Sequence, residues 1–168
     1  MNDFGISFSV PTPAGAFPQP PMAFVDTTMP VINGNTYTVN AGGDLQAAIN
    51  QAVAADPNLN HLIILQAGAT FLGPFTLPNK AGSGWIIVRS STADSNLPPP
   101  GTRITPAYAP VMPKIVSAST EPALSTTPGA HHFRFVGIEF MVLPSVTLNY
   151  FLVRLGDGSS VQNSLSQV

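Results

Sequence analysis

The side chains best suited to acid–base chemistry in this 168-residue sequence are isolated carboxylates. Eight Asp and Glu residues are scattered singly along the chain. Hydrolysis of a glycosidic bond needs two carboxylates about 5 to 10 Å apart. Glu139 and Asp157 lie 18 residues apart, and stacking of β-segments with that spacing would bring them together. We therefore consider both residues as candidates for ligand binding. In the alternative interpretation they form a solvated surface pair. We assign no catalytic residue.

Three arginines form a second group of candidate ligand-binding residues. Arg89, Arg134 and Arg154 each end or interrupt a β-favouring run. If they align on one face, they would form a short positive ladder that holds the carboxylates of acidic sugars through paired hydrogen bonds. In the alternative interpretation, their aliphatic stems cover apolar strands while the guanidinium groups remain in water.

The sequence predicts no metal site and shows no cofactor motif. His131 and His132 are adjacent, and adjacent residues on a strand point to opposite faces. His61 is isolated, so we expect all three histidines to be structural. The segment Gly156-Asp157-Gly158 offers one carboxylate where Ca²⁺ needs six to eight oxygen ligands. A plain turn is the better interpretation of that segment.

Composition favours a folded domain with an uncharged polar surface. Hydrophobic residues make up 44% of the chain and charged residues only 8%, against about 25% charged residues in an average domain. Ser, Thr, Asn and Gln must therefore provide most of the surface polarity, which suits hydroxyl-rich ligands. With six basic residues and a net charge of −2, the chain lacks the basic patch of a nucleic-acid-binding protein. No apolar run approaches the roughly 20 residues of a transmembrane helix.

One amphipathic helix is predicted after the turn at residues 40–43. Asp44 stands at the N-cap position, and the pair Asp56-Pro57 should end the helix. The apolar residues between them recur with helical spacing and share one face; they are Leu45, Ala48, Ile49, Ala52 and Val53. Because a three-turn helix is only marginally stable alone, this face must cover other apolar residues.

Short β-favouring runs separated by turns account for the remainder of the folded region. They cover residues 35–39, 62–65, 70–72, 75–77, 85–88, 114–116, 132–136, 138–140 and 151–154. One residue from each of five runs can be taken as an equivalent position of a repeat. These anchor residues are Ile63, Ile86, Ile115, Phe133 and Leu152, and successive anchors are 18 to 29 residues apart. Such periods are typical of solenoids. The pattern predicts an all-β stack of parallel coils.

Prolines divide the chain into a lead, coils and an insertion. Residues 1–34 are Pro-rich and predict an extended lead, and residues 35–168 would form the coils. Residues 92–113 contain six prolines and should loop out as an insertion, since proline is excluded from interior strands.

The segments LIILQAGATFLGPFTLP, WIIVRSS and AHHFRFVGIEF, in that order after a helix, resemble the N-terminal part of pectin-lyase-like and pectate-lyase-like proteins. The resemblance covers residues 35–168. It implies a right-handed parallel β-helix, a solenoid, with a short N-terminal capping α-helix. It also implies a secreted bacterial protein, extracellular or periplasmic, whose partner is an acidic or neutral polysaccharide.

The resemblance implies a polysaccharide lyase or glycoside hydrolase as the full-length protein, with Ca²⁺ as a cofactor in the lyase case. Catalytic groups of such proteins usually lie on central coils, so we expect this chain to be a truncated N-terminal portion that is inactive alone. The alternative is a non-catalytic carbohydrate-binding, adhesin or fibre-type protein. Residues 157–168 offer no cap for the last coil, which also predicts self-association through that open coil.

Overall fold

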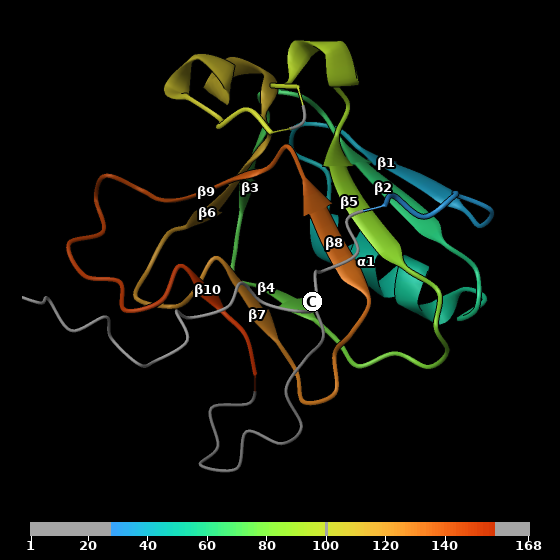
Figure 1. The fold of residues 1–168 in the computed structure, drawn as a ribbon. Helices are drawn as coiled ribbons and strands as arrows, with labels where there is room; N and C mark the ends of the chain where they lie inside the picture. The colour runs from blue at the N-terminus through green and yellow to red at the C-terminus, as the bar shows by residue number, and fades with distance from the viewer. Residues whose placement is uncertain (1–27, 100, 157–168) are drawn as a thin grey trace, which may run out of the picture.

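The computed structural model describes residues 28–99 and 101–156 (Figure 1). Ten β-strands, one α-helix and two short 3-10 helices form its regular structure. The strands are β1 (Thr36–Val39), β2 (His61–Leu65), β3 (Thr70–Leu72), β4 (Phe75–Leu77), β5 (Ile86–Ser90), β6 (Lys114–Ser117), β7 (Leu124–Thr126), β8 (Phe133–Val136), β9 (Glu139–Val142) and β10 (Val153–Arg154). The helices are α1 (Leu45–Ala54), η1 (Asp94–Asn96) and η2 (Pro106–Val111).

The strands form three sheets in which every pairing is parallel. Their orders are β1-β2-β5-β8, β3-β6-β9 and β10-β7-β4. Strands β1 and β2 are neighbours in one sheet, with α1 between them in the chain. From β2 to β10, consecutive strands belong to different sheets, and the chain visits the three sheets in turn. Figure 1 shows the four-stranded sheet beside α1 and the other two sheets on the opposite side of the molecule.

Helix α1 begins and packs as its sequence pattern predicts. The carboxylate of Asp44 accepts a hydrogen bond of 2.9 Å from the backbone N–H of Ala47, which caps the helix N-terminus. Four residues of the predicted apolar face are buried, namely Leu45, Ala48, Ile49 and Ala52. The helix contacts β1, β2 and β4 and ends at Ala54, just before Asp56-Pro57.

One hydrophobic core joins the helix to all three sheets. Alternation along β2 places His61, Ile63 and Leu65 on its buried face. The largest fully buried side chains of the core are Leu45, Ile49, Ile63, Leu65, Leu77, Ile86, Val88, Ile115, Leu124 and Phe133. They come from α1 and from strands of each sheet, so the packing of the three sheets depends on a shared interior.

The predicted fold class, an all-β right-handed parallel β-helix, is wrong. The described residues have a mixed α/β arrangement of parallel sheets and a helix, without a closed or solenoid sheet. Helix α1 is part of the common core through residues such as Leu45 and Ile49. The spacing of short β-runs indicates which segments are extended, but several arrangements of parallel sheets satisfy the same spacing.

The predicted equivalence of five anchor residues is also wrong. Ile86 does pair with Phe133, but Ile63 pairs with Val88. Ile115 lies in the sheet β3-β6-β9. One strand, β7, was not predicted at all, because the sequence Leu-Ser-Thr is short and only one of its residues is strongly apolar.

The Pro-rich segment 92–113 connects β5 to β6. It contains η1 and η2 and lies at the top of the view in Figure 1. Most of the predicted lead, residues 1–27, lies outside the described residues. Within the described ranges, none of the helices has the length and apolar character needed to cross a membrane.

Candidate ligand-binding site

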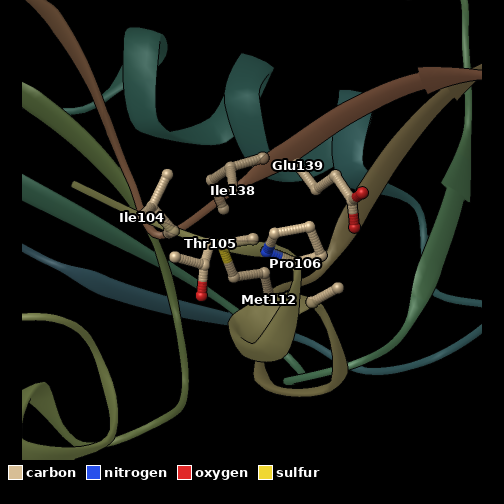
Figure 2. Close-up of a pocket in the computed structure, with 7 residues that line it drawn as sticks. Ile104, Thr105, Pro106, Met112, Ile138 and Glu139 are labelled. Carbon is tan, nitrogen blue, oxygen red and sulfur yellow. The ribbon is translucent and has the colours of Figure 1, made fainter.

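A pocket of about 370 Å³ lies where the segment before β6 faces the start of β9. Figure 2 shows Ile138 and Glu139 on one side of it, facing Thr105, Pro106 and Met112. Ile104 and Ala109 complete the lining. Ile104 is 47% exposed whereas Met112 is 7% exposed, so the pocket runs from an open rim to a buried apolar base. Its volume is within the usual range for small-molecule sites.

Strand pairing places the one carboxylate of this pocket. Lys114 of β6 is in register with Glu139 of β9, and the Nζ atom of Lys114 lies 3.5 Å from Oε2 of Glu139. Nζ also donates hydrogen bonds to the backbone carbonyls of Ala109, at 2.9 Å, and Met112, at 3.3 Å. The lysine thus neutralises the carboxylate while its short hydrogen bonds go to the loop that forms the pocket wall.

Glu139 keeps unused capacity to accept a hydrogen bond. Its Oε2 atom is buried, and no described residue donates a hydrogen bond to it. A buried acceptor with no partner is unfavourable by about 1 to 3 kcal/mol, and the ammonium of Lys114, 3.5 Å away, offsets part of that cost without donating a hydrogen bond. The Glu139 side chain as a whole is 32% exposed, so its carboxylate is open to a donor group of a ligand. The hydroxyl of Thr105 is the other polar side-chain group of the lining, within otherwise apolar walls.

The pocket does not contain the pair of carboxylates that glycoside hydrolysis requires. Glu139 is the single acidic residue among the described residues that line it. General acid and base or nucleophile roles need two such groups in most glycosidases. The geometry is therefore suited to binding a ligand, with the Glu139 carboxylate and the Thr105 hydroxyl as the side-chain groups that can set its orientation.

Two other hollows adjoin the turn before α1, with volumes of about 290 and 470 Å³. Asp44 lines both, but its side chain already caps the helix. Another residue at the turn, Ala41, donates its backbone N–H to the side chain of Gln66. Large apolar side chains such as Phe71 and Phe75 line part of the smaller hollow, and the larger one includes the polar residues Tyr37 and Gln51. The Glu139 pocket differs from both in having a carboxylate with an Oε2 atom that accepts no hydrogen bond from a described residue.

The three candidate arginines do not come together. Arg89 of β5 forms an ion pair with Asp94. Arg134 of β8 lies over the ring of Trp85 at 4.7 Å and is in register with Ile87. Arg154 is exposed on β10, which belongs to a different sheet. The described structure contains no continuous arginine ladder.

Of the two candidate acids, Glu139 lines the pocket and Asp157 lies outside the described residues. The proposed proximity of the pair is therefore not described. Across residues 28–99 and 101–156, no group of three or more His, Cys, Asp or Glu residues could hold a metal ion.

Sequence reasoning missed the apolar wall of the pocket. The prolines of residues 92–113 predict only that this segment leaves the coils, yet Ile104, Pro106 and Met112 from it line the pocket together with Ile138. The apolar residues of this Pro-rich insertion could have indicated that it packs against the domain. A fully solvated loop consists mainly of turn-forming and polar residues and seldom contains isoleucine and methionine.

Comparison of the chain with models of protein families, with curated proteins and with solved structures gives no match.

Proposed function

We propose that this protein recognises a neutral saccharide at the pocket formed by residues 104–112 and 138–139. The observation that carries the proposal is the partly exposed carboxylate of Glu139, which lines a largely apolar pocket. Its Oε2 atom accepts no hydrogen bond from a described residue. A sugar hydroxyl is a donor of suitable size, and the C–H faces of a sugar ring suit apolar walls.

The apolar walls support a saccharide over a fully polar ligand. Ile138, Pro106 and Met112 give the pocket surfaces without hydrogen-bonding side chains. Burial of apolar area contributes about 25 cal/mol for each Å² removed from water. A ligand must therefore present apolar surface as well as a donor, as the two sides of a pyranose ring do.

Charge balance supports a neutral ligand. Lys114 already accompanies Glu139, so a cation would gain little from this carboxylate. A uronate would bring a second negative charge close to Glu139, and like charges in a partly buried site repel. We therefore expect neutral oligosaccharides to bind more tightly than oligogalacturonates, although the sequence resemblance allowed both classes.

The test is calorimetric titration of the full chain with cello-oligosaccharides, galacto-oligosaccharides, manno-oligosaccharides and oligogalacturonates. At least one neutral series should bind with 1:1 stoichiometry. Glu139→Met removes the acceptor and keeps a side chain of similar length. This substitution should weaken binding by about 10- to 100-fold, which is the value of a hydrogen bond to a charged group.

The matched control is Glu121→Met, which makes the same chemical change at an exposed residue outside the pocket. It should bind as the wild type does. Failure of every neutral series to bind, or equal loss in both variants, would contradict the proposal. Thermal unfolding of each variant shows whether a loss of binding reflects a loss of folded protein.

A further inference from the structure

His131 and His132 meet in space, contrary to the prediction from an ideal strand. Their Nδ1 atoms are 2.6 Å apart. The cause is the backbone of His132, which has a φ of 58°, the single positive value at a non-glycine residue in the described ranges. This left-handed conformation turns the His132 ring back toward His131. Such conformations are unfavourable and are often found at functional sites.

The hydrogen bonds of the pair fix where its protons lie. Nε2 of His131 is 2.9 Å from the backbone carbonyl of Lys80. A carbonyl can only accept, so Nε2 carries a proton, and in the neutral ring Nδ1 holds a lone pair. The 2.6 Å contact then requires Nδ1 of His132 to carry the one proton shared between the rings.

Metal-binding histidines usually hydrogen-bond through one ring nitrogen to a backbone carbonyl or carboxylate and bind the metal through the other nitrogen. His131 has this arrangement, with Nε2 at the carbonyl of Lys80 and Nδ1 facing His132. Two nitrogens that each bind a metal ion at about 2.0 Å are about 2.8 Å apart when the nitrogen–metal–nitrogen angle is about 90°. They are about 3.3 Å apart when that angle is tetrahedral. The observed 2.6 Å is nearer to the right-angle value. A small rotation of either ring makes up the difference.

We propose that His131 and His132 bind a Cu²⁺ or Ni²⁺ ion through their two Nδ1 atoms, with water completing a tetragonal site. Binding requires the shared proton to leave Nδ1 of His132. No described residue is hydrogen-bonded to Nε2 of His132, so the proton can be taken up there and the ring stays neutral. Metal binding by the neutral pair therefore releases no net proton.

The surroundings of the pair have opposing effects on this site. Burial, together with His131 and Lys80, lowers the pKa of His132, which limits competition from protons at neutral pH. Lys80 is 8% exposed and donates to the carbonyl of Ala81; burial lowers its pKa as well. Its positive charge opposes a bound cation. Arg134, whose guanidinium stacks on Trp85 next to His132, adds a second positive charge nearby.

The experiment is titration of the full chain with Cu²⁺ in a non-coordinating buffer at pH 7.5, followed by electron paramagnetic resonance. The wild type should bind one ion with hyperfine splitting from two nitrogens. His132→Asn keeps a residue type that tolerates positive φ but removes the ligand, and it should weaken binding at least tenfold. Lys80→Met should strengthen binding, because it removes the nearby charge and leaves the backbone carbonyl in place.

His61 does not compete for the ion, because it is 2% exposed and both its ring nitrogens are hydrogen-bonded, to Asn35 and Asp56. Equal Cu²⁺ affinity in the wild type and His132→Asn would overturn the proposal, as would a spectrum without two nitrogen ligands. Nuclear magnetic resonance of the amide groups shows separately that His132→Asn retains the native fold.

Discussion

At the scale of single residues, the chemistry of this protein depends on groups whose partners come from distant parts of the sequence. Glu139 meets Lys114 through strand pairing, and His131 is held by the carbonyl of Lys80. Glu139 could be chosen from the sequence as a ligand-binding candidate because it lies 18 residues from Asp157, close to one repeat of the β-runs, although Asp157 lies outside the described residues. The meeting of His131 and His132 could not, because period-two alternation holds only for extended backbone and His132 leaves it.

The lowered pKa of His132 predicts a dependence of stability on pH. Burial, then His131 and Lys80, lowers this pKa in the folded state relative to the ordinary value of 6.5. The unfolded chain therefore binds more protons at this site, so the free energy of unfolding rises with pH. We expect the free energy of unfolding to fall as the pH drops below about 6.5, the ordinary pKa of histidine. The fall should end once the pH is below the lowered pKa of the folded state.

The measurement is the urea midpoint of unfolding between pH 7.5 and 5. His132→Asn should make this profile flatter than that of the wild type, because the titrating ring is gone. If the variant loses stability on acidification as steeply as the wild type does, the titration of His132 does not contribute.

At the scale of elements, local sequence patterns were sufficient to predict the position of α1 and of most strands. Asp44 and the apolar spacing from Leu45 to Ala52 predict the helix, its start and its buried face. The same kind of signal failed for β7, and it failed for the register of the strands, since Ile63 pairs with Val88. Register is set by packing between segments that are far apart in sequence, so a single run of residues does not contain it.

We expect the Asp44 cap at the N-terminus of α1 to contribute measurably to the stability of the protein. Asp44→Ala removes the acceptor for the N–H of Ala47 and should lower the free energy of unfolding by about 1 kcal/mol. Asp44→Asn keeps a capping oxygen and should cost much less. Chemical denaturation of both variants provides the comparison, and an equal cost for the two would show that the cap is unimportant.

At the scale of the whole molecule, the last strands of the three sheets leave edges without a partner among the described residues. These strands are β8, β9 and β10. Next to β10, the segment 148–155 exposes large apolar side chains; they are Leu148, Tyr150, Phe151, Val153 and Leu155. An exposed strand edge beside an apolar patch favours pairing with another chain. The sequence could indicate the apolar residues, but their exposure follows from the three-dimensional arrangement.

We therefore predict that the protein associates with itself as its concentration rises. Sedimentation velocity from 1 to 200 μM should show a shift to larger species. The double substitution Tyr150→Ser and Phe151→Ser should reduce that shift, and Leu72→Ser, at an exposed apolar residue of β3, is the control. Sedimentation as a monomer over the whole range would contradict the prediction.

Binding of a neutral saccharide beside Glu139 can be followed at the methyl groups that line the pocket. The most direct measurement is a titration of protein labelled in its isoleucine and methionine methyl groups with the neutral oligosaccharide that binds most tightly in calorimetry. We expect saturable shifts for Ile104, Met112 and Ile138, which line the pocket, and little change for the core residues Ile49 and Ile63. Shifts confined to methyl groups outside the pocket, or no shifts at saturating sugar, would contradict the proposal.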